Sequence, residues 1–537
     1  MKKLSLILVS STLLLLIGCG DANQTSLNGD VAPENNTSNT KSSTVVLYTS
    51  NKQEDQNYFL YASIDNVTTP LVPVDRFYSF EVLPDNKHLI YKYLEELYFI
   101  DMNNPTDIKQ LTFSTANSNK ITAYSLSPDL SKLVYRMYDD PNDEKLILLD
   151  IENNTSIILN NSEPRNVKIQ NFEWSPNGEK VLYSTGNINL TTELYTASSD
   201  GSHNQKISGI LKGQDVHYDY SWSPDSSKVL YLAALENNQS IELYTVFADG
   251  SHNTKISGSL SFSSQFTQLH NTYFWSADSN KVVFKAMPNI LNRPNLYSVL
   301  SDGTHLTKLN EDDIHNTRVN TLKLSPDAKS IGYTLYDYAD ENVELYTYSF
   351  ENNITTKVSG DILAEHHVYS TFQWSPDSRN ILFITDLDTL GVADMYSVRA
   401  DGSQRVNLTH NTTLQNISTP TWSPDGTKIM YRTQEYGRAL YVIDTTNHSS
   451  LMLHQEPVDG GSVSFITNGN NGFNYPVKQI PQWSPDSKNV LFAGDINIDG
   501  WTELYLSSST QTDNKNISNN SSASIHVDYY FIFQLSH

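Results

Sequence analysis

The sequence contains a single cysteine among its 537 residues. One thiol cannot form an intrachain disulfide, and it cannot supply the ligand set of a zinc ribbon or an iron–sulfur cluster. Basic residues are also scarce, because 36 Lys and Arg stand against 60 Asp and Glu, which gives a formal net charge of −24. A chain with this excess of negative charge repels phosphate backbones, so the composition argues against nucleic-acid binding.

The lone cysteine lies at the end of an N-terminal export signal. Lys2 and Lys3 precede an apolar segment, residues 4–17, which is too short to span a bilayer comfortably as a mature helix. The segment ends in Leu16-Ile17-Gly18-Cys19, which resembles a bacterial lipobox. We therefore predict that residues 1–18 are a lipoprotein signal peptide and that Cys19 carries the lipid. The alternative is an ordinary signal peptide with a chance cysteine.

The segment after the cysteine is rich in Asn, Ser and Thr and poor in large apolar side chains. Such a composition cannot bury enough surface to offset its chain entropy, so residues 19–44 are predicted to be a flexible tether. Acyl chains on Cys19 would anchor the protein in the bacterial cell envelope. Gly20, in place of the aspartate that retains enterobacterial lipoproteins in the inner membrane, favours the outer membrane if the source is Gram-negative.

The remaining residues, 45–537, repeat one phrase with a period of about 50 residues, which is typical of propellers, solenoids or arrays. The phrase is Trp-Ser-Pro-Asp or a close variant, followed by a short apolar strand. The clear copies begin at Trp174, Trp222, Trp374, Trp422 and Trp483, and weaker copies begin at Leu83, Leu126, Trp275 and Leu324.

Each part of the phrase predicts one element of local structure. Ser-Pro-Asp-Gly favours a type I turn, and the Lys-Val-Leu-Tyr that follows favours a strand. A second strand, Glu-Leu-Tyr, follows at a fixed spacing, as from Tyr231 to Tyr244, and an Asp-Gly hairpin then leads to a short fourth strand. Four antiparallel strands per repeat predict an all-β propeller of about ten four-stranded blades, with eight to ten as the range.

The two ends of the chain complete each other in this pattern. The spacing from Tyr48 to Tyr61 matches a blade that lacks its first strand, and residues 526–535 resemble the strand that precedes each Trp-Ser-Pro-Asp. We therefore predict that the C-terminal segment supplies the missing inner strand and closes the ring without open sheet edges. A ring that skips a degenerate unit, or two smaller propellers, are the alternatives.

The phrase Trp-Ser-Pro-Asp-Gly-x-Lys-Ile-x-Tyr, with its later Glu-Leu-Tyr and Asp-Gly-Ser, resembles the WD40-like (PD40) repeat of the TolB family. Similar repeats form the propeller domains of prolyl oligopeptidase-type enzymes and of oligogalacturonate lyases. The resemblance runs from Val45 to the end of the chain and implies a propeller, a fold that supports many functions. TolB also has a separate α/β domain, which has no counterpart here, so binding to Pal is not implied.

No catalytic constellation stands out from the sequence. The Gly-x-Ser-x-Gly elbow of an α/β-hydrolase is absent, and no thiol remains in the fold. The leading hypothesis is a non-catalytic propeller that binds an envelope protein, a peptide or a glycan. The alternative is a polysaccharide lyase or hydrolase that uses histidines at the mouth of the central channel. These candidate ligand-binding residues, which also fit polar positions at strand entry, are His217, His270, His367 and His526.

One segment resembles the start of a calcium loop. Asp495, Asn497 and Asp499 alternate before Gly500, and hard oxygen ligands around a glycine turn suit Ca²⁺. The bidentate glutamate that such a loop needs is replaced by Leu506. An ordinary polar turn is the alternative, and no other cofactor is predicted.

Overall fold

A computed structural model describes the chain from residue 42 to residue 536, with gaps. The described strands form ten antiparallel sheets. No described residue is helical. The described ranges are 42–50, 58–64, 67–74, 80–83, 85, 87–93, 96–105, 107–112, 120–140, 143–160, 168–187, 190–209, 216–233, 241–260, 262, 272–287, 293–310, 317–362, 366–410, 417–433, 439–455, 463–464, 481–494, 496, 503–518 and 527–536. These ten sheets, each with the strand order of a propeller blade, confirm the predicted all-β propeller class.

Two compact units make up the chain, and the first joins residues from both ends, 1–112 and 454–537. It contains three sheets. The first has the order β3-β2-β1-β41, the second β4-β5-β6-β7, and in the third both β36 and β37 pair with β38, which continues to β39 and β40. The bounds are β1 Ser42–Ser50, β2 Tyr58–Ile64, β3 Val67–Val74, β4 Phe80–Val82, β5 His88–Tyr93, β6 Glu96–Asp101, β7 Ile108–Gln110, β36 Val463–Ser464, β37 Gln482–Trp483, β38 Asn489–Gly494, β39 Glu503–Ser508, β40 Lys515–Asn516 and β41 Val527–Ser536.

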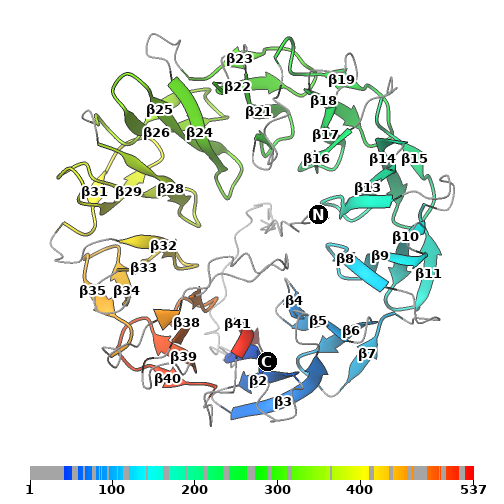
Figure 1. Ribbon diagram of the computed structural model, residues 1–537, viewed down its shortest axis with the longest axis horizontal. Coiled ribbons are helices and arrows are strands. Elements are labelled where there is room, and N and C mark those ends of the chain that lie inside the picture. Colours follow the sequence, from blue (N-terminus) through cyan, green and yellow to red (C-terminus); the bar gives the residue numbers. More distant parts are fainter. Residues whose placement is uncertain are drawn as a thin grey trace, which may run out of the picture. The chain divides into compact units, whose positions relative to one another are not determined.

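The second unit, residues 113–453, contains seven four-stranded sheets. In each, successive strands are neighbours. Within this unit, the first strands that Figure 1 labels, such as β8 and β24, lie on the inner side of an arc. The bounds of the first four sheets are β8 Lys120–Leu126, β9 Lys132–Asp140, β10 Asp143–Asp150, β11 Thr155–Ile158, β12 Lys168–Trp174, β13 Lys180–Asn187, β14 Leu190–Ser198, β15 Gln205–Lys206, β16 Val216–Trp222, β17 Lys228–Ala233, β18 Glu242–Phe247, β19 Thr254–Lys255, β20 Tyr273–Trp275, β21 Lys281–Ala286, β22 Asn295–Leu300 and β23 Thr307–Lys308. Those of the last three are β24 Thr317–Leu324, β25 Ser330–Asp337, β26 Asn342–Ser349, β27 Thr355–Lys357, β28 Val368–Trp374, β29 Asn380–Thr385, β30 Asp394–Arg399, β31 Val406–Asn407, β32 Ser418–Trp422, β33 Lys428–Arg432, β34 Leu440–Asp444 and β35 Ser450–Met452.

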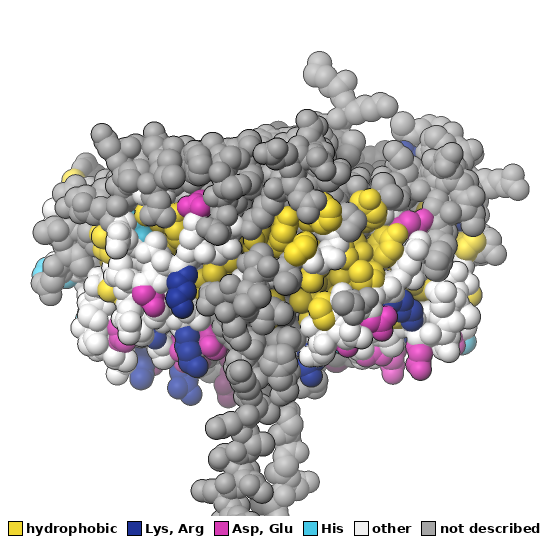
Figure 2. All heavy atoms as spheres, turned by 90° about the horizontal axis from the view of Figure 1, so that it is seen from below, with side chains coloured by type: hydrophobic (Ala, Val, Ile, Leu, Met, Phe, Trp, Pro, Cys, Tyr) yellow, Lys and Arg dark blue, Asp and Glu magenta, His cyan; other side chains and the backbone are white. Residues whose placement is uncertain are grey.

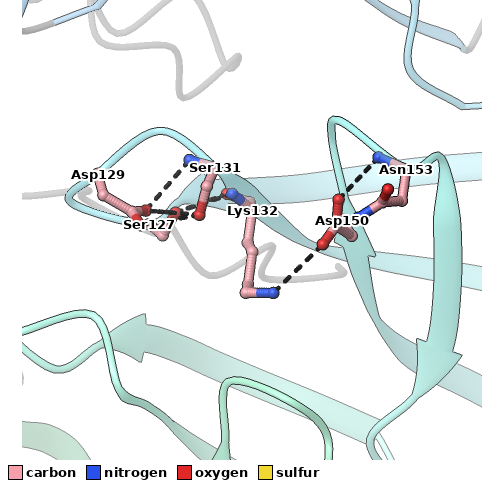
Figure 3. Close-up of polar contacts among 6 residues, drawn as sticks. All are labelled: Ser127, Asp129, Ser131, Lys132, Asp150 and Asn153. Carbon is pink, nitrogen blue, oxygen red and sulfur yellow. Dashed lines mark hydrogen bonds and ion pairs between the residues drawn. The ribbon is translucent and has the colours of Figure 1, made fainter.

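The Ser-Pro-Asp turn between the first two strands is held by its own side chains (Figure 3). In the β8–β9 turn, Ser127 Oγ donates to Asp129 Oδ1 at 2.6 Å and accepts from the backbone N–H of Lys132 at 2.9 Å. The backbone N–H of Leu130 bonds to the Ser127 carbonyl at 2.9 Å, and Leu130 has a positive φ of 61°. This is a type I turn followed by one left-handed residue, a common hairpin geometry that suits glycine at the fourth position, as at Gly178. Where serine fills it, as at Ser226, the hydroxyl accepts the backbone N–H of Asn177 in the turn of the preceding blade.

The aromatic residues of the repeat form one stacked pair in most blades. Tyr231 in β17 lies directly opposite Tyr244 in β18, and their ring centroids are 5.6 Å apart. Equivalent stacked pairs with centroids 5.1–5.8 Å apart are Tyr48–Tyr61, Tyr91–Tyr98, Tyr183–Tyr195, Phe284–Tyr297, Tyr333–Tyr346, Phe383–Tyr396, Tyr431–Tyr441 and Phe492–Tyr505. The spacing seen in the sequence is therefore a cross-strand register, and such pairs stabilise a sheet beyond the area that they bury.

A buried polar side chain locks the short fourth strand to the third. In the β16–β19 blade the N–H of Ile256 bonds to the Leu243 carbonyl at 2.9 Å, while Ser257 Oγ accepts the N–H of Leu243 at 3.2 Å. The hydroxyl continues the ladder after the strand has ended, so a two-residue strand still leaves no orphaned backbone N–H. Side chains in the equivalent position are Thr112, Asn160, Ser208, Asn310, Ser359, Thr409 and Ser518.

The predicted pairing of the chain ends is confirmed. β41 from the C-terminus pairs antiparallel with β1, and Val46 lies opposite Ile532. In a blade made from one continuous segment, Val229 lies opposite Trp222 in the same register. The C-terminal strand thus takes the place of an inner strand in the first sheet.

Neighbouring blades bury hydrophobic side chains against each other within each unit. In the first unit Tyr48 and Tyr61 pack with Leu491 and Leu504 of the β36–β40 sheet. In the second unit Leu230 and Leu243 pack with residues such as Trp275 and Phe284. The repeat tyrosines and tryptophans are therefore core residues, as the propeller class requires.

In the view of Figure 2, charged side chains gather along the lower edge, with hydrophobic ones above them. The most exposed large hydrophobic side chains include Ile354 and Leu390. Within the described ranges, the protein has no helix whose length and hydrophobicity would let it cross a bilayer.

Candidate functional site

Each blade has two ends with different chemistry. The turns between its first and second strands and between its third and fourth strands share one end, which we call the turn end. The hairpin between the second and third strands and the connection to the next blade share the other, which we call the loop end. At the turn end, carboxylates are used structurally, since hydrogen bonds from Ser127 and Ser202 help to hold the pKa values of Asp129 and Asp200 below the usual range.

His203 and His252 lie in turns between the third and fourth strands, at the turn end. Each has a positive φ of 52°, and His203 Nδ1 contacts Ser202 Oγ at 2.7 Å. His305 holds the equivalent left-handed position, whereas His448, also with a positive φ, lies in the longer β34–β35 turn. These histidines are turn residues rather than a cluster.

Most of the predicted site residues lie outside the described part of the chain. These are Cys19, His270, His526, Asp495, Asn497 and Asp499. The backbone of His217 is the second residue of β16, but its side chain is not among those described. The lipid site, the calcium loop and most of the histidine cluster therefore stay predictions.

His217 and His367 do not occupy equivalent positions in their blades. Val216 pairs with Ala233, and Val368 pairs with Thr385. Both partners lie in the second strand of their blade, two residues after its stacked aromatic residue. His217 follows the first of these paired valines, whereas His367 precedes the second. Because side chains alternate along a strand, position relative to the pairing register decides where each side chain can point, and the sequence offset alone does not show it.

His367 lies at the loop end beside a buried carboxylate. Its backbone N–H donates to Asp386 Oδ1 at 2.7 Å, and the neighbouring His366 Nδ1 lies 2.7 Å from the Asp386 carbonyl oxygen. Asp386 Oδ2 accepts the backbone N–H of Gly391 at 3.1 Å, so this carboxylate holds both sides of the loop end. Burial, with the nearby Asp386 charge, raises the pKa of Tyr369. His367 Nδ1 is buried and has no hydrogen-bond partner within the described ranges.

A second carboxylate of the same blade is also engaged. Asn407 donates to Asp388 Oδ2 at 2.8 Å, and His410 Nδ1 lies 3.6 Å from the same oxygen. Hydrogen bonds from Tyr396 and Asn407 hold the pKa of Asp388 below its usual range. The polar turn that contains Asp386 and Asp388 is thus a hydrogen-bonded corner. Where the chain is described, no three His, Cys, Asp or Glu side chains are grouped so as to hold a metal ion.

His367 ends a row of residues that crosses a whole blade at its loop end. Arg318 in β24 lies opposite Tyr336 in β25, and Tyr336 lies opposite Val343 in β26. Val343 in turn forms an isolated parallel bridge with His367 of the next blade. Arg318 and His367 occupy equivalent positions in their blades. Each directly precedes a valine, Val319 or Val368, whose partner in the second strand lies two residues after the stacked aromatic residue.

A cluster of cations and tyrosines surrounds the first half of this row, and we call it the Arg–Tyr cluster. It consists of Arg293, Arg318, Tyr336 and Tyr338, with Lys285 beside it. Arg293 lies over the Tyr338 ring with its guanidinium carbon 4.7 Å from the centroid. The Arg318 guanidinium carbon is 5.6 Å from the Tyr336 centroid and 5.8 Å from that of Tyr338. The two rings meet edge to face, with centroids 4.8 Å apart.

Two adjacent blades contribute to the cluster and are fastened together beneath it. The N–H of Val319 bonds to the carbonyl of Pro294 at 2.9 Å, which fixes the backbone next to Arg293. Lys285 donates to the Asn320 carbonyl at 3.1 Å, at a β-bulge in β24. Burial lowers the pKa of Lys285, and the positive charge of Arg318 lowers it further, so these two cations are electrostatic neighbours.

The Arg–Tyr cluster was not predicted from the sequence. Arg293 belongs to the loop end of one blade, and Arg318 to the first strand of the next. Tyr336-Asp337-Tyr338 extends beyond the repeat tyrosines and was the available signal, because an added aromatic pair at a hairpin tip is not needed for the core. Only the fold shows that two arginines lie over these rings.

The inner strands also contain a buried carboxyl group, on Glu173 in β12. The side chain as a whole is partly exposed, but its Oε1 is buried and has no hydrogen-bond partner among the described residues. Burial raises the pKa of Glu173 to about 8, and a hydrogen bond from the backbone of Trp222 in the next blade opposes this shift. Lys323 and Gln373 hold the same position in their blades, directly before the Leu or Trp that ends the first strand. Both donate hydrogen bonds to backbone carbonyls of the next blade. Glu173 thus occupies a position that links blades.

Comparisons with known proteins support no family assignment. No family model matches the sequence, and no curated protein matches it. Solved structures with a similar fold include dipeptidyl peptidase 4 of Porphyromonas gingivalis (10% identity, TM-score 0.45, covering 78% of this chain and 64% of that one). Others are a eukaryotic initiation factor (13%, 0.46, covering 76% and 96%) and an oligogalacturonate lyase of Vibrio parahaemolyticus (13%, 0.35, covering 69% and 97%). This chain therefore spans less than two thirds of the peptidase, and the low identities do not extend the likeness to activity.

Proposed function

We propose that this protein is a bacterial envelope lipoprotein whose TolB-like propeller binds another envelope protein without catalysing a reaction. The lipobox ending in Cys19 supports the anchor, and the Trp-Ser-Pro-Asp repeat supports the family resemblance. The observation that carries the binding role is the Arg–Tyr cluster. Arginine and tyrosine are the side chains most enriched, with tryptophan, at the energetic centres of protein interfaces.

Regular blade scaffolding suits such a role. Polar side chains such as Ser257 complete the ladder of each blade, and backbone bonds such as Pro294 to Val319 tie neighbouring blades. A rigid frame that presents loop-end side chains in fixed positions lowers the entropy lost on binding. Propellers commonly serve as such platforms, so the fold is compatible with this proposal.

The anchor is tested by Cys19→Ser. Metabolic labelling with palmitate should mark the wild-type protein and not the variant, and the variant should move from the membrane fraction to the soluble fraction. Labelled C19S protein would contradict lipidation at this residue. Separation of inner and outer membranes on a density gradient tests the outer-membrane location.

The binding role is tested by capture from detergent-solubilised envelopes with the full-length protein as bait. Three baits are compared by quantitative mass spectrometry: wild type, R293Q/R318Q, and R379Q as a matched surface control. A partner enriched by wild type and R379Q but lost with R293Q/R318Q supports the proposal. The absence of any such partner, together with turnover of a glycan by the purified protein, would overturn it.

The second candidate function is a polysaccharide lyase or hydrolase centred on His367. The observation that favours it is the buried Nδ1 of His367, which lacks a partner in the described chain and lies on a residue bonded to Asp386. A histidine with a free ring nitrogen is a common general base. Turnover of acidic or neutral polysaccharides that is lost in His367→Ala and kept in the exposed control His252→Ala would support it.

A further inference from the structure

We propose that the Arg–Tyr cluster is a binding site for an acidic peptide segment of the partner, with the two guanidinium groups as the carboxylate receptors. This inference rests on the proposed binding function and names the chemistry of its ligand. It concerns a single face, at the loop end of the two blades that contain β20–β23 and β24–β27. The following observations carry it.

The first observation is a group of three cations in an acidic protein, beside a hairpin whose described residues Asp337, Asp340 and Glu341 form no ion pair with either arginine. Arg293, Arg318 and Lys285 lie together, although the chain has 60 acidic and 36 basic residues. Among the described residues no carboxylate lies within ion-pair distance of either arginine, whereas repeat lysines such as Lys255 are paired with a glutamate of their own blade. The two arginines, which have no carboxylate partner among the described residues, are therefore available to an external anion.

The second observation is how the guanidinium groups are held. Each guanidinium lies within cation–π distance of a tyrosine ring, Arg293 over Tyr338 and Arg318 over Tyr336. A guanidinium that contacts a ring through its face can still donate hydrogen bonds from its N–H edge. Arginine donates in a planar fork that matches a carboxylate in a bidentate pair. Because Pro294 and Val319 fix the backbone beside both arginines, little order has to be gained when a ligand binds.

The third observation favours a peptide over a polyanionic glycan. The net charge of −24 repels a long polyanion along the whole surface, whereas a short acidic segment needs attraction at one point only. Tyr338 is 37% exposed, so its ring offers contact area to neighbouring apolar side chains of a peptide. Arginine clusters are a recurrent means of recognising acidic peptide motifs.

The experiment measures fluorescence anisotropy with a labelled synthetic peptide that contains four glutamates among glycine and serine residues. A peptide with glutamines in their place is the ligand control, and a labelled oligogalacturonide tests a glycan. The mature full-length protein is compared with R293Q/R318Q, R293K/R318K and R379Q. Arg379 belongs to a turn-end turn, its side chain is 82% exposed, and its loss removes positive charge without touching the cluster.

The expected result is binding of the glutamate peptide that weakens at least about tenfold in R293Q/R318Q and less than about twofold in R379Q. R293K/R318K should fall between wild type and R293Q/R318Q, because lysine keeps the charge and loses the fork. This graded result also separates a binding effect from misfolding, which a thermal unfolding curve of each variant checks directly.

Three carboxylates that precede β24 in the sequence, Glu311, Asp312 and Asp313, lie outside the described residues. The experiment therefore includes E311Q/D312N/D313N. Unchanged or tighter binding of the glutamate peptide by this variant supports the arginines as the receptor. A loss as large as that of R293Q/R318Q would overturn the assignment.

Equal binding of the glutamate and glutamine peptides would also overturn the inference, as would an arginine-dependent affinity for the oligogalacturonide alone. These failures differ from a failure of the proposed function. A partner captured from envelopes by wild type and by R293Q/R318Q alike would leave a binding protein whose site lies elsewhere. If the wild-type protein neither binds the glutamate peptide nor captures a partner, both proposals fail.

Discussion

Val46 in β1 lies opposite Ile532 in β41, so residues from the two ends of the chain form one blade. The register equals that of Val229 and Trp222 in a blade built from one continuous segment. The first blade is therefore completed by the last strand, and without that strand the backbone edge of β1 would be free. An open edge of this kind invites self-association.

Deletion of residues 527–537 should destabilise the first unit and promote aggregation. Loss of the β1–β41 ladder removes several backbone hydrogen bonds, each worth roughly 0.5–1.5 kcal/mol, so we expect a loss of at least about 3 kcal/mol. Thermal unfolding and size-exclusion chromatography measure the two effects. Deletion of residues 20–41, which stops before β1, is the matched control and should leave both unchanged. Equal behaviour of the two deletions would contradict the role of β41.

Stability should fall with rising pH through Glu173. The pKa of this carboxyl is raised from 4.5 to about 8 in the folded chain, so the folded state binds the proton more tightly than the unfolded state does. The contribution of Glu173 to the free energy of unfolding is therefore fully present below pH 4.5 and is lost as the pH rises to about 8. Between these values the loss is about 1.4 kcal/mol for each pH unit. Unfolding free energies between these pH values, compared for wild type and Glu173→Gln, measure it.

In Glu173→Gln the dependence on pH should be flatter, because the neutral amide has no proton to lose. Glu152 lies exposed in a turn of the neighbouring blade, and Glu152→Gln is the control that should keep the wild-type slope. A wild-type slope in both variants would show that Glu173 ionises normally in the folded protein.

Ser257→Ala should lower the free energy of unfolding by about 1–3 kcal/mol, the cost of a buried donor left without its acceptor. Ser257 is fully buried, and its Oγ accepts the N–H of Leu243. Ser156 lies exposed in β11, so Ser156→Ala should change stability by less than about 0.5 kcal/mol. Chemical denaturation of both variants gives the comparison, and equal losses would argue against a locking role for Ser257.

Gly303→Ala should destabilise the fold more than Gly391→Ala. Both glycines have positive φ, 86° and 76°, and an alanine in that region costs roughly 1–2 kcal/mol. A Cβ on Gly303 would also approach the Lys255 carbonyl oxygen to 3.2 Å, whereas a Cβ on Gly391 meets open space. The difference between the two unfolding free energies therefore isolates the steric contact between β22–β23 and the preceding blade. Equal losses would mean that this contact relaxes.

Much of the fold follows from local sequence. Ser-Pro-Asp sets the turn because Ser127 and Asp129 satisfy its backbone through their own side chains, whatever surrounds them. The fixed spacing from Tyr231 to Tyr244 sets the register, since a slip by one residue would turn every side chain to the other face. The same spacing from Tyr48 to Tyr61 reveals the incomplete blade and predicts its partner strand.

Less of the candidate site could be predicted from the sequence. His367 was predicted from its place before a first strand, but its link to Asp386 and its bridge to Val343 depend on the bend of two loop-end segments. Arg293 and Tyr338 were not predicted at all, because they come from adjacent blades and meet only through packing. The repeat identifies residues that all blades have in common. The residues of the Arg–Tyr cluster are not common to the blades, so the repeat does not identify them.

The sequence by itself thus determined the blade, the number of repeats and the pairing of the chain ends, because turns, strand registers and cross-strand pairs are local and recur. Only the tertiary structure decided which polar atoms are buried without a hydrogen-bond partner in the described part of the chain, as at Glu173 Oε1, and which cations gather over aromatic rings, as at Arg318. Those properties depend on distances between side chains of different blades. Such distances are fixed by the packing of sheets against each other and leave no periodic signal in the chain.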